Sequence, residues 1–246
     1  MTVLDFFDIN NTLINFAIGG GYAMSWIEAV ATISGVLCIW FITKEKVINF
    51  AFGLVNVSLF AVIFYQIQLY GLLMLQLYFF VMNIYGWYAW SKPASDENAL
   101  MIRWMDNKKL MAVVVVSALG IAVMTSYIDP FFSILAAVAV QLINLFGANV
   151  VMPELQPDAF PFWDSAITLL SVMAQLLMTR KYVENWVLWV LVNLISVGVY
   201  AAQGVYALSI QYVILLVIAL AGVRQWSKAA KEVEHQGLQL KPSSFV

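Results

Sequence analysis

The chain has 246 residues, of which 63% are hydrophobic and 11% are charged, and its formal net charge at pH 7 is -2. Its mean hydropathy is +0.87. Soluble domains carry about 25% charged residues, so this composition excludes a soluble globular domain and predicts an integral membrane protein surrounded by the lipid bilayer. We expect no nucleic acid among its partners.

The first apolar segment, residues 1–17, is short and carries Asp5 and Asp8. A transmembrane helix needs about 20 apolar residues, so we interpret this segment as a helix lying at the membrane interface. The glycine run at 19–21 is expected to end it. It lacks the basic start of a signal peptide. Residues 1–21 are therefore predicted to form an N-terminal interfacial segment.

Charge-free runs predict the membrane spans. Residues 47–91 and 185–223 contain no Asp, Glu, Lys or Arg, and each is long enough for two spans. The Lys and Arg residues fall in four clusters, at 44–46, 92–109, 180–181 and 224–241. Basic loops stay in the cytoplasm, so the N-terminus is expected outside and the C-terminus inside. The seven predicted spans are residues 22–43, 47–67, 69–91, 110–128, 162–179, 183–203 and 205–226.

One more apolar stretch, residues 131–152, cannot be an eighth span without moving Arg180 and Lys181 to the outside. We interpret it as a re-entrant or surface-lying helix on the outer side. All six prolines, at 93, 130, 153, 157, 161 and 242, are expected in linkers. The sequence therefore predicts no proline-broken helix of the kind that many transporters use for ion sites.

Residues 26–92 resemble residues 162–228 at an offset of 136, with slips of one residue. Matched features are Thr43 with Thr179, Asn49 with Asn185, Asn56 with Asn193, Gln68 with Gln203, Tyr70 with Tyr206, Gln76 with Gln211, and WSK at 90–92 with WSK at 226–228. One span separates the halves, so the repeat is expected to be parallel.

The predicted fold is an all-α integral membrane protein in which two parallel three-helix repeats are joined by a linker helix (3+1+3). The repeats are residues 22–92 and 162–228. Residues 93–161 contain the linker helix, at about 110–128, and the outer-side segment. Residues 229–246 form a cytoplasmic tail. Such repeats commonly hold a substrate between them near the membrane midplane.

Deep polar side chains recur in both repeats and are candidates for that site. Trp186, Trp189 and Asn193 share one face of a predicted helix, and Asn193 lies about 15 Å from its inner end. Amides at such depths must find partners in protein, water or ligand. The other candidates are Asn56, Gln76, Phe80, Asn83 and Gln211, with Phe79, Trp87 and Trp90 on or beside the face of Gln76 and Asn83.

A purely structural role for these residues is the alternative. Membrane helices also use Asn and Gln to bind one another, and Trp and Tyr form belts at the membrane surface. We interpret Trp90, Trp226, Tyr70, Tyr206 and Trp104 as belt or loop residues. Trp189 and Asn193 lie too deep for a belt, which favours a ligand site.

Aromatic faces and neutral amides suit a flat polar ring with a carboxamide or hydroxyls, and stacked aromatic rings suit a delocalised cation. No Arg or Lys lies deep enough for an anionic substrate, and no deep carboxylate could carry protons or sodium. The spans lack a catalytic arrangement of the Ser/His, Cys/His or HExxH kind. Cys38 is alone and His235 lies in the tail, so we expect no metal, no cofactor and no enzyme. The implied mechanism is facilitated diffusion.

The segments WIEAVATISGVLCIW, FGLVNVSLF, NIYGWYAWS, MPELQPDAFPFWDS and TRKYVENWVLWVLVNLISV closely resemble the PnuC family of bacterial nicotinamide riboside transporters over about residues 22–228. This resemblance implies an architecture similar to the SWEET sugar transporters and a place in the bacterial inner membrane. It also implies import of nicotinamide riboside, a vitamin B3 precursor of NAD, without an evident coupling ion. Phosphorylation by a cytoplasmic riboside kinase would draw uptake forward, and a homotrimer is expected.

The family motif WxxWxxxN falls on Trp186, Trp189 and Asn193, and the Gln and Asn of its third core helix fall on Gln76 and Asn83. Nicotinamide riboside is a pyridinium cation with a carboxamide and a ribose, which fits the predicted pocket. Two other classes stay open. A helical assembly subunit would use the amides only for packing, and a channel-like facilitator would lack a saturable site.

Overall fold

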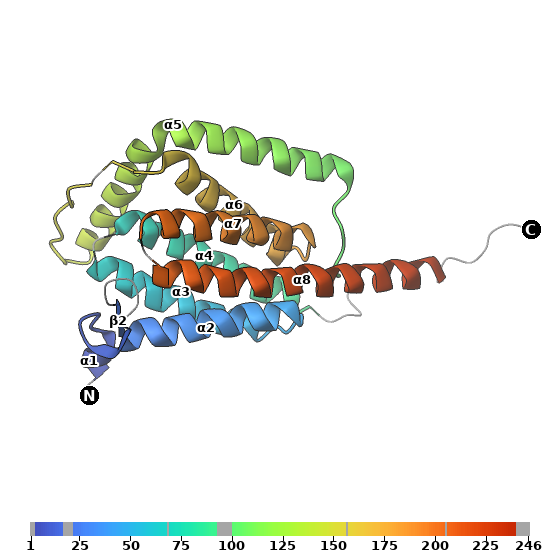
Figure 1. The fold of residues 1–246 in the computed structure, drawn as a ribbon, viewed down its shortest axis with the longest axis horizontal. Helices are drawn as coiled ribbons and strands as arrows, with labels where there is room; N and C mark the ends of the chain where they lie inside the picture. The colour runs from blue at the N-terminus through green and yellow to red at the C-terminus, as the bar shows by residue number, and fades with distance from the viewer. Residues whose placement is uncertain are drawn as a thin grey trace, which may run out of the picture.

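The computed structural model describes residues 3–16, 22–67, 69–92, 100–155, 157–204 and 206–239. Within these residues, seven helices are long and apolar enough to cross a membrane, which confirms the seven predicted spans. They lie side by side as a bundle (Figure 1). Their bounds are α2 Trp26–Thr43, α3 Asn49–Gln66, α4 Tyr70–Trp90, α5 Asn107–Leu145, α6 Pro161–Thr179, α7 Glu184–Ala202 and α8 Tyr206–Gln239.

Six of these helices form a closed ring. Helix α3 packs between α2 and α4, and α7 packs between α6 and α8, while α4 also contacts α6 and α2 contacts α8. Helix α5 contacts α4 and α6 from outside the ring. The end of the bundle where α2, α4 and α6 finish is here called the basic end, because Lys44, Lys46, Arg180 and Lys181 lie there.

The N-terminal segment does not form the predicted helix over residues 1–17. Helix α1 spans only Val3–Phe7, and the antiparallel strands β1 Thr12–Phe16 and β2 Tyr22–Ser25 follow it. The carboxylate of Asp8 accepts a hydrogen bond from the backbone N–H of Asn10 (2.9 Å), and such an Asx-type turn competes with a helix. The side chain of Gln66 at the end of α3 donates to the carbonyl of Phe7 (2.7 Å) and holds the segment. The run at 19–21 lies outside the described residues.

Helix α5 extends over Asn107–Leu145 but is divided by a kink at Tyr127, whose backbone is non-helical (φ -130°, ψ 22°). The arm before the kink covers the linker helix predicted at about 110–128, and Pro130 lies near the start of the arm beyond the kink. The prediction that every proline lies in a linker is therefore wrong for Pro130, and also for Pro161, which begins α6. A proline inside a helix removes a backbone hydrogen bond and bends the helix.

The arm of α5 beyond the kink crosses the end of the bundle opposite the basic end (Figure 1). Ala136, Ala139 and Val140 are buried there and pack against Leu73 and Met74 near the start of α4. Residues 131–145 of the predicted outer-side segment 131–152 are thus helical, and its re-entrant or surface-lying placement in the membrane stays a prediction. This packing against α4 holds the arm across the end of the bundle.

Contacts at equivalent positions support the predicted duplication. The indole N–H of Trp90 donates to the carbonyl of Thr179 (3.2 Å), and that of Trp226, 136 residues later, donates to the carbonyl of Ile42 (3.1 Å). Glu45 and Lys181, also 136 apart, have left-handed backbones (φ 56° and 57°) that end α2 and α6 in the same way. Gln68 lies outside the described residues.

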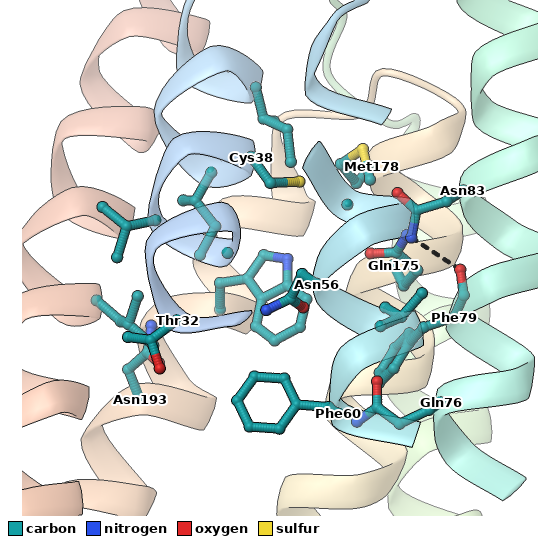
Figure 2. Close-up of a pocket in the computed structure, with 18 of the residues that line it drawn as sticks. Thr32, Cys38, Asn56, Phe60, Gln76, Phe79, Asn83, Gln175, Met178 and Asn193 are labelled. Carbon is teal, nitrogen blue, oxygen red and sulfur yellow. Dashed lines mark hydrogen bonds between the residues drawn. The ribbon is translucent and has the colours of Figure 1, made fainter. Parts of the chain in front are cut away.

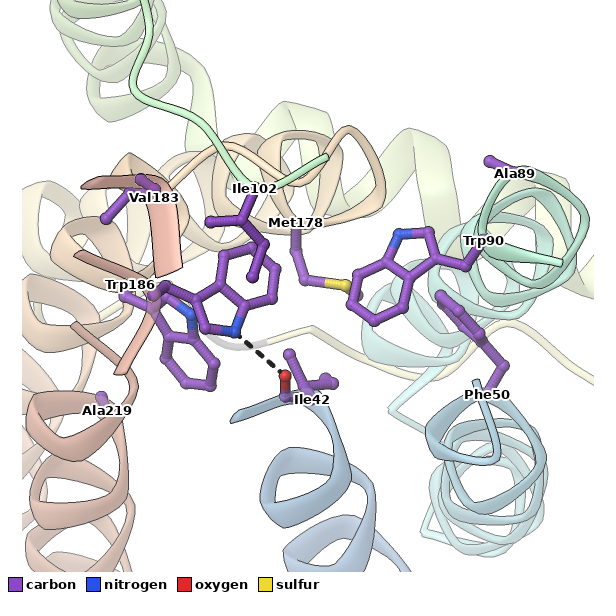
Figure 3. Packing of buried hydrophobic residues seen from close by; sticks show 11 residues of the cluster. Ile42, Phe50, Ala89, Trp90, Ile102, Met178, Val183, Trp186 and Ala219 are labelled. Carbon is purple, nitrogen blue, oxygen red and sulfur yellow. Dashed lines mark hydrogen bonds between the residues drawn. The ribbon is translucent and has the colours of Figure 1, made fainter. Parts of the chain in front are cut away.

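A buried aromatic cluster fills the basic end of the ring (Figure 3). This basic-end core consists of Ile42, Phe50, Ala89, Trp90, Ile102, Met178, Val183, Trp186, Ala219, Trp226 and Ala230. The belt interpretation is therefore wrong for Trp90 and Trp226, because their indoles are buried in protein and not at the lipid surface. Trp104 is 46% exposed, as a loop residue should be. The side chains of Tyr70 and Tyr206 lie outside the described part of the chain.

Helix α8 runs past the basic end to Gln239 (Figure 1). The sequence predicts a span that ends at 226 and a cytoplasmic tail over 229–246. In the structure, residues 229–239 of this tail continue the helix, and residues 240–246 lie outside the described part.

Candidate functional site

A cavity of about 330 Å³ lies inside the ring, between α2–α4 on one side and α6–α8 on the other (Figure 2). This volume falls in the range of about 300–1,000 Å³ that is typical of small-molecule sites. The lining side chains are Thr32, Val36, Cys38, Ile39 and Ile42 of α2; Asn56, Val57, Phe60 and Phe64 of α3; Gln76, Phe79 and Asn83 of α4; Gln175 and Met178 of α6; Asn185, Trp186, Trp189 and Asn193 of α7; and Gln211, Tyr212 and Leu215 of α8. Gly35 and Gly53 contribute backbone.

The structure brings seven of the eight predicted site residues to this one cavity. They are Asn56, Gln76, Asn83, Trp186, Trp189, Asn193 and Gln211. Phe80 does not line it and is 37% exposed, whereas its neighbour Phe79 does line it. Successive residues of an α-helix differ in direction by about 100°. The prediction therefore chose the correct helix, α4, but the neighbouring residue, whose ring does not line the cavity.

The amides in the cavity are only partly satisfied by the protein. The side-chain N–H of Asn56 donates to the carbonyl of Ala31 (2.8 Å), and that of Asn83 donates to the carbonyl of Phe79 (2.8 Å). A carboxamide has two donor hydrogens and an acceptor oxygen, so each retains capacity for a ligand. The buried indole N–H of Trp186 has no hydrogen-bond partner among the described residues. The cavity therefore presents donors and acceptors on an aromatic background.

Sequence reasoning missed several lining residues, including Thr32, Phe60, Gln175 and Tyr212. Gln175 is buried in α6, and a signal for it existed, because it is an uncharged amide inside an otherwise apolar span. Thr32, Phe60 and Tyr212 carried no comparable signal, since such residues are common on all faces of membrane helices.

The described lining carries no Asp, Glu, Lys or Arg. Charged groups instead close the basic end. Lys181 is buried, forms an ion pair with Glu45, and places its ammonium 4.9 Å from the ring centre of Trp90. Lys181 and Glu45 belong to equivalent turns of the two halves, so their pair joins the halves beyond the cavity.

A strap formed by residues 100–105 crosses the same end. The backbone N–H of Arg103 donates to the carbonyl of Lys181 (3.2 Å), and the N–H of Val183 donates to the carbonyl of Arg103 (3.1 Å). The N–H of Met105 donates to the carboxylate of Glu184 (2.8 Å), and Ile102 joins the basic-end core. The basic end is therefore closed in this structure.

Comparison with known proteins identifies the family. Residues 25–228 match the profile of the nicotinamide mononucleotide transporter family. The nicotinamide riboside transporter PnuC of Escherichia coli K12 is 54% identical over 93% of this chain and 97% of its own length, and its counterpart from Neisseria mucosa is 27% identical over 87% and 75%. A riboflavin/roseoflavin transporter, RibM of Streptomyces davaonensis, is 28% identical over 58% and 57%.

A solved structure, described as that of the vitamin B3 transporter PnuC, superposes with a TM-score of 0.60 at 26% identity, covering 84% of this chain and 83% of that one. These relatives and the family are transporters rather than enzymes, and the predicted resemblance is confirmed. The chain belongs to the nicotinamide mononucleotide transporter family, whose members are multi-pass membrane transporters.

Proposed function

We propose that this protein imports nicotinamide riboside by facilitated diffusion, with the substrate held in the cavity between the two halves. The observation that carries the proposal is the uncharged lining of aromatic rings and amides. It fits a pyridinium cation with a carboxamide and a ribose. Relatives named nicotinamide riboside transporters, one of them 54% identical, support the same substrate.

The charge of the lining favours the riboside over the mononucleotide. A phosphate monoester carries about 1.5 to 2 negative charges at pH 7, and burying such a charge without a cation is costly. The described lining offers no Lys or Arg to pair with it. Trp189 and Asn193 are proposed to contact the pyridinium ring and a polar group of the substrate, respectively. Gln76, Asn83 and Gln211 supply the further amides.

Uptake into proteoliposomes tests this function. We expect saturable uptake of nicotinamide riboside, competition by excess riboside, weak competition by the mononucleotide, and greater accumulation when a riboside kinase and ATP are enclosed. Non-saturable uptake would favour a channel-like facilitator, and no uptake would favour an assembly subunit. Riboflavin is added as a further competitor in this assay, because the riboflavin/roseoflavin transporter RibM is a relative and the described cavity lining is uncharged. The expected homotrimer and the role of the kinase stay predictions.

Release toward the basic end requires the closed arrangement there to open. We propose that the Glu45–Lys181 pair and the strap separate when substrate leaves. Both lie at the end of the cavity that the basic-end core closes. The basic loops are proposed to face the cytoplasm, as the distribution of Lys and Arg predicts.

A topology experiment checks this orientation. Reporters fused after Lys92, Lys109 or Lys181 should behave as cytoplasmic, and a reporter fused after Glu154 should behave as external. The physical reason is that short loops rich in Lys and Arg resist translocation. Paired alkaline phosphatase and green fluorescent protein fusions measure it. An external position for Lys181 would contradict both the orientation and the parallel repeat.

The mechanism also predicts independence from ion gradients. Collapsing the proton or sodium gradient across the proteoliposome should leave the initial rate of riboside uptake unchanged. The described cavity lining contains no carboxylate that could bind and release a coupling ion. Initial rates with and without ionophores measure this, at zero membrane potential because the substrate is a cation. A several-fold drop would show coupling.

Removing one amide should weaken binding. Asn193→Ala is expected to reduce affinity for the riboside by about 1 to 3 kcal/mol, because a buried ligand group loses its hydrogen-bond partner. Isothermal titration of purified protein measures the change. Asn107→Ala, at an exposed position at the start of α5, is the matched control. Unchanged affinity in a folded Asn193→Ala protein would assign Asn193 to packing.

A further inference from the structure

Two glycines face the amides that line the cavity. A Cβ added at Gly53 of α3 would lie 2.2 Å from the side-chain oxygen of Asn83 on α4. A Cβ added at Gly35 of α2 would lie 2.7 Å from the side-chain nitrogen of Asn56 on α3. Real Cβ atoms essentially never approach other atoms so closely, so each amide occupies space that exists only because its neighbour is glycine.

The colliding atoms belong to the ends of flexible side chains. Addition of a methyl group at Gly53 or Gly35 can therefore be relieved by rotating an amide, with little disturbance of the backbone. This differs from Gly86 and Gly222, where a Cβ would meet the rings of Phe50 and Trp186 at 2.3 and 2.4 Å within the basic-end core. A change at Gly53 or Gly35 therefore disturbs the cavity wall more than the fold.

The second half has different residues at the same places. The positions 136 residues after Gly53 and Asn83 are Trp189 and Ala219. Trp189 lines the cavity, and Ala219 is buried in the core against which Trp189 packs. The pair Gly and Asn in one half thus corresponds to the pair Trp and Ala in the other. At this one pair of positions, the amide of Asn83 on the first wall of the cavity is therefore matched by the indole of Trp189 on the second.

We propose that Gly53 and Gly35 are positioning residues of the substrate site, which hold the amides of Asn83 and Asn56 in the orientation that binds substrate. The inference deepens the proposed function and rests on it for the identity of the ligand. Hydrogen bonds are directional, so an amide rotated away from its place cannot serve the same ligand group. On this proposal the glycines act only through the amides. A glycine substitution should therefore have almost no further effect on binding once the amide that it faces has been removed.

The experiment is a double-mutant cycle on the purified full-length protein, read as the dissociation constant for nicotinamide riboside. Gly53→Ala and Asn83→Ala are each expected to weaken binding roughly tenfold, on the scale of one lost hydrogen bond. With Asn83→Ala already present, Gly53→Ala should change binding by less than about twofold, because the colliding oxygen is gone. The remaining close neighbour, the sulfur of Cys38 at 3.2 Å, needs to move only slightly.

Three controls accompany the cycle. In the double mutant Gly53→Ala with Asn56→Ala, the two separate losses of affinity should multiply, because Asn56 faces the other glycine, Gly35. Gly35→Ala should show the reverse pattern. It should cause no added loss of affinity when Asn56→Ala is present, and its effect should multiply with that of Asn83→Ala. Gly198→Ala, on α7, has open space around the added Cβ and should leave binding unchanged. The unfolding temperature of each variant reports separately on the fold.

Wild-type binding of Gly53→Ala, or an effect that multiplies with that of Asn83→Ala, would overturn the proposal. A crystal structure of Gly53→Ala provides a readout that needs no ligand: a rotated Asn83 amide supports the proposal, and an unmoved amide overturns it. Failure of the wild-type protein to bind the riboside would instead contradict the proposed substrate, and the crystal structure would still decide the role of Gly53.

Discussion

Replacing Trp189 by Leu is expected to weaken binding of nicotinamide riboside about 30-fold, with Phe giving an intermediate loss. Trp189 lines an uncharged cavity, where attraction between a cation and an indole face is worth about 2 kcal/mol or more, and each 1.4 kcal/mol corresponds to about tenfold in affinity. Phe keeps a weaker ring and Leu keeps only apolar bulk. Isothermal titration and uptake with the Trp, Phe and Leu proteins measure the series.

An uncharged reduced analogue of the riboside separates charge from packing. Its affinity should fall much less along the same series, because it lacks the pyridinium charge. Trp87→Leu is the matched control, since this indole lies on α4, is 39% exposed and does not line the cavity. Equal losses for the charged and neutral ligands would show that Trp189 serves packing only.

The largest effect on stability is expected at Trp226. Trp226→Ala should lower the free energy of unfolding by about 3 to 5 kcal/mol, because it leaves a cavity in the basic-end core. The indole is 0% exposed, packs edge-on against Trp186 with ring centres 5.7 Å apart, and donates to the carbonyl of Ile42. This hydrogen bond joins α8 to the end of α2, so its loss also loosens the two halves.

Trp226→Phe distinguishes the two contributions. It keeps most of the packing and removes the indole N–H, so a loss of about 1 kcal/mol is expected. Thermal unfolding in one detergent measures both variants, and Trp104→Ala, at an exposed indole, should stay near the wild-type value. A Trp226→Ala protein as stable as wild type would contradict the burial of this side chain at the junction of the halves.

The amino-acid sequence alone was enough to predict the membrane class, the seven spans and four of the six helices that line the cavity, α3, α4, α7 and α8. The bilayer core offers no water to the backbone, so a helical span pairs its own polar groups and is visible in the sequence as a run of about 20 mostly apolar residues. Depth then singled out Asn56, Asn83, Asn193 and Trp189, because amides and indoles in the middle of a span are uncommon without a partner or a ligand. These signals are local, and each can be read within one helix.

Which residues contact one another depends instead on how the helices pack. Trp90 and Trp226 resemble belt residues by position, yet both are buried, because each indole donates to a carbonyl in the opposite half. The course of α5 beyond its kink at Tyr127 likewise depends on another helix, because the second arm packs on α4.

The pairing of Glu45 with Lys181 and the fit of Asn83 against Gly53 join residues on different helices. The exact face of a helix that meets the cavity, which selects Phe79 over Phe80, depends on how the ring of helices closes. Hydropathy is a property of each segment alone, whereas a contact partner depends on the packing of segments distant in sequence, and no single segment encodes it.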